Sequence, residues 1–174
     1  MKEKIDIASW SGIYPALLTP FTSENRINEK ALCKLIDWNL EKGVTGFYVC
    51  GSTAEAFLLS QEERKQLVEL VSGYAGDKAK VIAHVGCIGT DMAVDLAEHA
   101  ARCGVDAISS IPPFYYAFSF EEIKSYYNRL ADTVNLPVLL YNFPAFSGVT
   151  LNHHNIDAFF WAFHGSGRRD RQHL

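Results

Sequence analysis

The chain has 174 residues, of which 48% are hydrophobic and 21% charged, and its net charge is -4. This length and composition predict a globular protein with a buried core, most simply a single domain. The slightly acidic balance gives no electrostatic basis for binding nucleic acid or an anionic membrane, so we expect small molecules as partners.

The cysteines and the N-terminal residues indicate a compartment. Cys33, Cys50, Cys87 and Cys103 form no CxxC pair, and the first ten residues lack the apolar stretch of a signal peptide. No run approaches the roughly 18 apolar residues that span a bilayer. We therefore expect reduced thiols and a cytoplasmic protein.

Five short apolar runs follow one another along the chain. They lie at residues 13–18, 46–50, 81–85, 107–111 and 137–141. None alternates cleanly between apolar and polar residues, which is typical of parallel strands that are covered on both faces.

The segments between these runs carry helix start and stop signals. The start residues are Ser60 with Glu63 and Ser119 with Glu122, and the stop residues are Gly43 and Gly104. A serine followed three residues later by a glutamate predicts a capping box, in which both side chains bond to backbone N–H groups at the helix start. Glycine accommodates the left-handed residue that ends many helices.

The spacing of the runs predicts the architecture. They begin about every thirty residues, the length of one βα unit in an eight-fold barrel of about 250 residues. This spacing fits an α/β fold of the TIM (β/α)8 barrel type at residues 1–160, with about the first five βα units present. A doubly wound sheet also alternates strand and helix, so the periodicity alone leaves the two architectures open.

Residues 161–174 differ from the rest of the chain. Three of the seven arginines fall in the last seven residues, and no further strand pattern accompanies them. A disordered basic tail, a frameshift or alternative end that replaces the natural continuation, and an interaction tail all remain open.

Gly51, Ser52 and Thr53 directly follow the second apolar run. Glycine lets the backbone approach a ligand closely, and the two hydroxyls and successive N–H groups are donors suited to a carboxylate. The alternative is that Ser52 and Thr53 merely cap the turn into the next segment.

Two further side chains have both a chemical and a structural interpretation. Tyr141 ends the fifth run, at the end of the strands where barrel enzymes place their chemistry, and its phenol is able to relay protons. A buried structural tyrosine is the alternative. His84 is interpreted as a hydrogen-bonded core residue, because no partner stands at metal-ligand spacing, and no metal is assigned.

Three motifs in order, one in each of three expected loops, point to a known family. They are GSTAEAF at 51–57, PFYY at 113–116 and YNFPAFSGV at 141–149. Together they resemble the N-acetylneuraminate lyase and dihydrodipicolinate synthase family over about residues 10–160. The resemblance implies a TIM barrel, a class I aldolase that works through a Schiff base without external cofactor, pyruvate and a sugar acid as ligands, and a homo-oligomer for the intact family member.

The resemblance also implies roles for individual residues. Tyr141 matches the catalytic tyrosine that relays the proton, and residues 51–53 match the segment that holds the substrate carboxylate. Tyr115 matches a tyrosine near the proton relay. Phe114 and Tyr116 flank it, which leaves this assignment open by one position, and an aromatic lid is the alternative.

The loop at 144–149 bears on the substrate. In the synthase branch of the family an arginine follows two positions after the loop proline, where it holds the carboxylate of an aldehyde; here that place is taken by Phe146. The chain therefore resembles the sialic-acid lyase branch more closely, which cleaves N-acetylneuraminate to N-acetylmannosamine and pyruvate. Other pyruvate-dependent sugar-acid aldolases and a synthase-like enzyme remain alternatives.

One part of the family pattern is missing. The Schiff-base lysine of the family lies on strand six, after the last motif present here. The lysines of this chain are Lys2, Lys4, Lys30, Lys34, Lys42, Lys65, Lys78, Lys80 and Lys124. None is suitably placed, so we expect no lyase turnover from this polypeptide alone. In addition, five parallel strands leave open sheet edges, which favour association or aggregation. The chain is then either a truncated or misread aldolase sequence, or a non-catalytic product that binds carboxylates or the intact enzyme.

Overall fold

The computed structural model describes residues 7–159. Its helices and strands are α1 (Glu29–Glu41), β1 (Gly46–Val49), α2 (Gln61–Ala75), β2 (Lys80–His84), α3 (Thr90–Arg102), β3 (Ala107–Ser110), α4 (Phe120–Thr133), β4 (Val138–Leu140) and α5 (Pro144–Ser147), with short 3-10 turns at Ile7–Trp10, Ser52–Ala54 and Gly76–Lys78. The expected tail at 161–174 lies outside the described residues. Within them, no helix is long and apolar enough to cross a membrane.

Four parallel strands form one sheet in the order β1-β2-β3-β4. Each strand therefore lies beside the next strand in the chain, as expected for consecutive βα units. The register pairs Gly46 with Lys80 and Ile108 with Val138.

The first predicted strand, at 13–18, is reduced to a single bridge between Ala16 and Tyr48. The segment still lies parallel to β1, since the Tyr48 N–H donates to the Pro15 carbonyl at 3.0 Å and the Leu17 N–H donates to the Tyr48 carbonyl at 2.9 Å. Pro15 has no N–H, so the rung that would extend this ladder toward Gly46 cannot form. The expectation of a regular strand here was wrong, although the segment takes the expected place.

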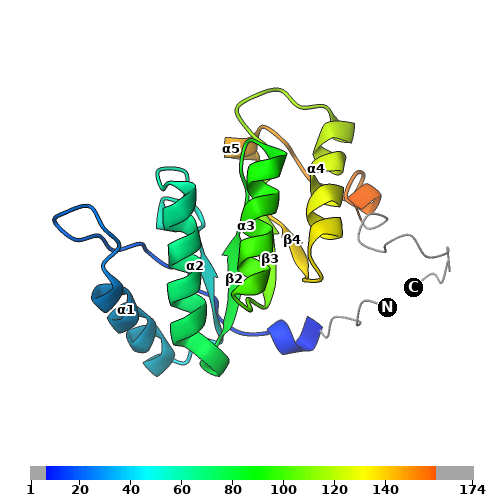
Figure 1. Ribbon diagram of the computed structural model, residues 1–174. Helices are drawn as coiled ribbons and strands as arrows, with labels where there is room; N and C mark the ends of the chain where they lie inside the picture. The colour runs from blue at the N-terminus through cyan, green and yellow to red at the C-terminus, as the bar shows by residue number, and fades with distance from the viewer. Residues whose placement is uncertain (1–6, 160–174) are drawn as a thin grey trace.

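Helices α1 to α4 stand side by side in front of the sheet (Figure 1). Each packs against the next, with contacts between α1 and α2, α2 and α3, and α3 and α4. A doubly wound sheet carries helices on both faces, whereas a barrel carries them all on the outer face. The arrangement therefore resolves the ambiguity of the sequence in favour of the barrel type.

Side chains alternate between the two faces of the sheet. Phe47 and Val49 of β1 are fully buried in the core that the helices cover, whereas Tyr48 between them lies on the other face. In β2, Val81 and Ala83 belong to the same core. The helix-covered face is thus apolar, and the opposite face is free to carry polar side chains.

Both predicted capping boxes are confirmed. The Ser60 hydroxyl accepts from the Glu63 N–H, and the Glu63 carboxylate accepts from the Ser60 N–H at 2.8 Å; Ser119 and Glu122 repeat the arrangement at the start of α4. Gly43 and Gly104 have φ of 81° and 75°, the left-handed backbone expected just after α1 and α3. These local signals fixed where the helices begin and end.

Candidate functional site

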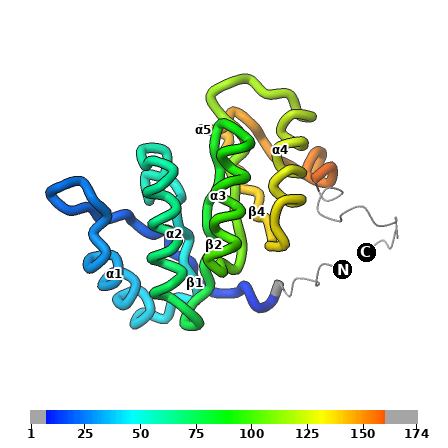
Figure 2. Tube along the Cα trace, in the orientation of Figure 1, coloured from blue at the N-terminus to red at the C-terminus, as the bar shows by residue number. Residues whose placement is uncertain are grey.

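The loops that follow β1, β3 and β4 lie at one end of the sheet, at the top of Figures 1 and 2. Parallel strands place all their carboxyl ends at the same edge, so residues far apart in sequence meet there. Residues 51–53 follow β1, and Tyr141 follows β4 directly.

The loop after β1 is a tight 3-10 turn. Its carbonyl at Gly51 accepts from the Ala54 N–H at 3.1 Å, and the Thr19 hydroxyl donates to the Ala54 carbonyl at 2.9 Å, which ties the turn to the N-terminal segment. Ser52 and Thr53 are exposed, and their hydroxyls form no hydrogen bond to any residue in the range 7–159. Among the described residues, the turn therefore presents two hydroxyls without a partner on a fixed backbone.

Gly51 sits against the ring of Tyr48. A Cβ at position 51 would come within 2.6 Å of Tyr48 Cε1, closer than carbon atoms approach one another. Glycine is required here because a ring occupies the place of a side chain, and not because of an unusual backbone: its φ is -84°.

Tyr48 connects the β1 loop to Tyr141. Its ring meets the Tyr141 ring edge-on, with centroids 6.1 Å apart, and its hydroxyl donates to Ser109 Oγ at 3.0 Å. Burial is the main cause that raises the pKa of Tyr48 to about 12, so this phenol stays protonated and acts as a fixed donor. The side chains of β1, β3 and β4 are thereby joined on the face opposite the helices.

His84, at the end of β2, lies beneath these rings. Its Nδ1–H donates to the Cys50 carbonyl at 3.0 Å, and its Nε2 accepts from the Ile111 N–H at 3.2 Å. Burial, followed by the nearby positive charge of Arg64, lowers the pKa of His84 to about 3, so the ring is neutral. The interpretation of His84 as a hydrogen-bonded core residue is confirmed.

Arg64 of α2 supports the same strand end from the helix side. Its guanidinium donates to the His84 carbonyl at 2.9 Å and to the Gly86 carbonyl at 3.2 Å, and it contacts Cys87 Sγ at 3.1 Å. Only 4% of this residue is exposed. Arg64 therefore fixes the β2 carboxyl end that carries His84.

Tyr115 is not brought together with the other predicted site residues. It is 83% exposed with a φ of 78°, and its ring packs edgewise on Tyr116 at 4.9 Å rather than on Tyr141. Phe146, in the short helix α5 after β4, is 71% exposed and packs on Phe143. Both side chains point to solvent within the described chain.

Sequence reasoning missed Tyr48. Its only signal was its place in an apolar strand, three residues before the start of the GSTAEAF motif. The strand periodicity of two puts it on the face opposite Phe47 and Val49, where it lines the site.

No lysine of the described range lies near Tyr141. Lys80 opens β2, where its amine donates to Ser9 Oγ at 3.2 Å and lies 4.3 Å from the Trp10 ring centroid. His84 is four residues further along the same strand, about 13 Å away at the usual rise per residue. The other lysines between residues 7 and 159 lie on helices, on a 3-10 turn or at a helix end.

Comparison with known proteins agrees with the motifs. Residues 9–160 match the dihydrodipicolinate synthetase family. N-acetylneuraminate lyase of Escherichia coli (strain SMS-3-5 / SECEC) is 46% identical over 142 residues, which are 81% of this chain and 48% of the relative. The chain thus spans about half the length of the curated relatives it matches.

Solved structures agree on the fold. CdNal from Clostridium difficile, in complex with mannosamine, aligns with a TM-score of 0.83 at 41% identity, over 86% of this chain and 52% of that chain. A catalytic lysine mutant of Ruminococcus gnavus sialic acid aldolase aligns with a TM-score of 0.86 at 34% identity, over 90% of this chain and 52% of that chain. The chain belongs to the dihydrodipicolinate synthetase family of pyruvate-dependent class I aldolases and lyases, and within that family it is similar to N-acetylneuraminate lyases.

Proposed function

We propose that this chain provides the carboxylate-binding and proton-relay part of an N-acetylneuraminate lyase-type aldolase site, and that it does not turn over by itself. The observation that carries the proposal is the contact series from Gly51 through Tyr48 to Tyr141 at the carboxyl end of the sheet. It joins a loop rich in donors to a phenol over a separation of ninety residues.

The donors of the β1 loop fit the acid end of pyruvate. Ser52 and Thr53 offer exposed hydroxyls with no competing partner in residues 7–159, and the Tyr48 ring fixes the backbone that carries them. Hydrogen bonds to a charged acceptor are stronger than those between neutral groups, so two hydroxyls suffice to orient a carboxylate.

Tyr141 is the proposed proton relay. In the mechanism that the family resemblance implies, a lysine amine attacks the C2 ketone of N-acetylneuraminate, and the resulting iminium accepts the electron pair of the C3–C4 bond as that bond breaks. Tyr141 relays the proton of the C4 hydroxyl: it passes its own phenol proton on, toward C3 of the enamine, as it receives the hydroxyl proton, and the C4 oxygen becomes the aldehyde oxygen of the released N-acetylmannosamine. The remaining enamine is protonated and hydrolysed to pyruvate.

The segment after β4 supports a sugar acid as the proposed substrate. Phe146 stands where a synthase would hold a second carboxylate with an arginine, and a phenyl ring makes no ion pair. The curated N-acetylneuraminate lyases support a sugar acid as substrate, and the relative solved with mannosamine supports an amino sugar as the other product. The four free cysteines fit a cytoplasmic enzyme of this kind.

Borohydride trapping tests the absence of turnover. Incubation of the purified chain with pyruvate and borohydride, followed by peptide mass spectrometry, is expected to yield no reduced adduct on any of the nine lysines. The assay of N-acetylneuraminate cleavage is expected to show no N-acetylmannosamine. An adduct mapped to one lysine would overturn the proposal that this chain lacks the Schiff-base lysine.

Carboxylate binding is tested separately by following the backbone amide resonances of the chain during a pyruvate titration. Saturable shifts at Ser52 and Thr53 are expected, and Thr53→Val should weaken binding about tenfold, the usual effect of losing a hydrogen bond to a charged group. Ser23→Ala is the matched control, because Ser23 is an exposed serine whose hydroxyl bonds only to the adjacent Glu24. Equal weakening in both variants, or no saturable shift, would contradict the assignment.

A second candidate is a non-catalytic carboxylate-binding protein, and the placement of the lysines favours it over an active enzyme for the isolated chain. The two candidates differ in one experiment. If the second half of a related lyase, added as a separate polypeptide, restores cleavage that depends on Tyr141, the chain is a functional part of an aldolase. Pyruvate binding without any restored cleavage would favour the non-catalytic protein.

A further inference from the structure

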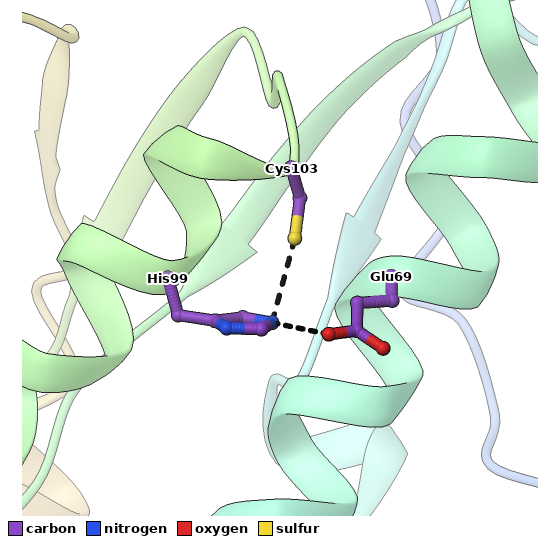
Figure 3. Close-up of side chains that lie close together, drawn as sticks. All are labelled: Glu69, His99 and Cys103. Carbon is purple, nitrogen blue, oxygen red and sulfur yellow. Dashed lines mark hydrogen bonds and ion pairs between the residues drawn. The ribbon is translucent and has the colours of Figure 1, made fainter.

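Three potential metal ligands meet on the outer surface of the helix layer, between α2 and α3. They are Glu69 of α2, His99 in the last turn of α3, and Cys103 at its C-terminal cap (Figure 3). One carboxylate oxygen, one imidazole nitrogen and the sulfur all lie within 4.8 Å of one another. Figure 3 shows the three side chains converging on the same small space.

Local structure explains why they converge. His99 and Cys103 are four residues apart, so they lie one above the other on the same helical face. The packing of α2 against α3 brings Glu69 opposite them. The sequence contained this spacing, but Glu69 is thirty residues away from His99 and only the helix pairing shows that it belongs to the group.

The distances match the edges of a tetrahedral metal site. His99 Nε2 lies 3.3 Å from Glu69 Oε1 and 3.4 Å from Cys103 Sγ. Around Zn²⁺ at its usual bond lengths, tetrahedral ligands of these types are separated by about 3.4 Å for nitrogen and oxygen and about 3.6 Å for nitrogen and sulfur. An ion therefore needs only small adjustments of the side chains to bind all three.

The surroundings suit a bound cation. The His99 side chain is 13% exposed and so is held by its neighbours, whereas the Glu69 side chain is 58% exposed, which leaves a path for an ion and a place for water. A divalent cation would supply the positive charge that a carboxylate and a thiolate together require.

We propose that Glu69, His99 and Cys103 form a binding site for Zn²⁺, with water as the fourth ligand. Binding replaces the thiol proton of Cys103, which goes to solvent, and uses the lone pair of a neutral His99 whose remaining proton is on Nδ1. The two anionic ligands balance the charge of the ion. The mixture of thiolate, imidazole and carboxylate favours zinc over magnesium or calcium, which prefer oxygen ligands.

This site is separate from the aldolase site. His99 and Cys103 are at the end of α3, and α3 runs away from the edge of the sheet that carries the loops after β1, β3 and β4 (Figure 1). Its role is to join α2 to α3 through a metal bridge, and the proposal does not depend on the proposed lyase function.

Metal titration of the reduced, tag-free chain tests the proposal. Equilibrium dialysis against Zn²⁺ is expected to give one ion per chain. Co²⁺, used as a coloured substitute, is expected to show the visible bands of a tetrahedral site and a sulfur-to-cobalt charge-transfer band. Cys103→Ser should abolish that band, and His99→Gln and Glu69→Gln should each weaken Zn²⁺ binding at least tenfold.

Matched controls separate this site from incidental binding. Cys33→Ser removes another partly exposed thiol, and Glu98→Gln removes an exposed carboxylate of α3; neither should change binding. Zn²⁺ should also slow alkylation of Cys103 but not of Cys33 in the unsubstituted chain, a readout that needs no variant to fold. Cobalt binding without the charge-transfer band, for instance at the exposed pair His153 and His154, would overturn the proposal. Alkylation of Cys103 at an unchanged rate in the presence of Zn²⁺ would overturn it as well.

Discussion

At the scale of single residues, His84 joins strand ends that the sequence leaves far apart. Its two ring nitrogens bond to the backbone at Cys50 and Ile111. The backbone carbonyl of His84 accepts a hydrogen bond from the Arg64 guanidinium. Both ring bonds need the neutral form with the proton on Nδ1. A second proton would sit on Nε2, facing the Ile111 N–H, and would break one of them.

The pKa of His84 makes a prediction for stability against pH. Its value of about 3 in the folded chain is below the unfolded value near 6.5, so the unfolded state binds the extra proton first as the pH falls. The stabilising contribution is complete above about pH 6.5 and declines below it by about 1.4 kcal/mol per pH unit. Urea unfolding at several pH values should show the advantage of the wild type over His84→Gln narrowing by about 2 kcal/mol between pH 6.5 and pH 5.

The control for this experiment is His153→Gln, which removes an exposed histidine. It should leave the slope of stability against pH close to that of the wild type. A constant difference between His84→Gln and the wild type over this pH range would contradict the assigned cause.

Tyr48→Phe tests the link between β1 and β3. The variant keeps the ring that packs on Gly51 and Tyr141 but removes the hydroxyl that donates to Ser109. We expect a loss of about 0.5–1.5 kcal/mol in the free energy of unfolding, the usual net value of one hydrogen bond. Denaturant titrations at neutral pH measure it, and an unchanged midpoint would show that the bond contributes nothing.

Residues differ in how far the sequence predicts them. His84 was predicted correctly because it interrupts an apolar run with no ligand partner nearby. Tyr48 was missed, since only the observed sheet shows which face each strand residue takes. Tyr115 is part of the PFYY motif, but it has a left-handed backbone and an exposed ring, which the motif does not reveal.

At the scale of elements, helix starts were the most predictable features. Two serine–glutamate pairs predicted capping boxes, and both are present because the hydrogen bonds involved lie within four residues. Residues 13–18 illustrate the opposite case. Their apolar character predicted a strand, but the ladder depends on a donor that Pro15 lacks.

The cap of α2 gives a stability prediction. Ser60→Ala should lower the free energy of unfolding by about 1 kcal/mol, because the Glu63 N–H loses its acceptor. Ser60→Gly should cost only a few tenths of a kcal/mol, because glycine adapts to the backbone of the cap and leaves room for water. Chemical denaturation of the two variants compares them directly, and equal losses would argue against a capping role.

At the scale of the whole molecule, β4 is an open edge strand of the sheet in the described chain. Within residues 7–159 it pairs with β3 on one side and with no strand on the other. All three of its residues are only partly buried. An edge of this kind pairs readily with another chain.

We expect the purified chain to associate through β4, which light scattering after size-exclusion chromatography would detect. Hydrogen exchange locates the contact. The Tyr141 N–H donates to the Ser110 carbonyl at 2.9 Å and should be protected throughout, whereas the Val138 and Leu140 amides point to the outer edge and should gain protection only on association. A monodisperse monomer with all three amides equally protected would refute this expectation.

The common direction of the strands also determines how the chain can be completed. A polypeptide that pairs with β4 in the same direction ends its strand beside Tyr141, so a side chain at that terminus faces the phenol. One that pairs in the reverse direction presents its amino end there, so a lysine at its carboxyl end lies at the far side of the sheet. The direction of a strand that pairs with β4 therefore decides whether a side chain at its carboxyl end reaches Tyr141 or whether the strand only covers the open edge of the sheet.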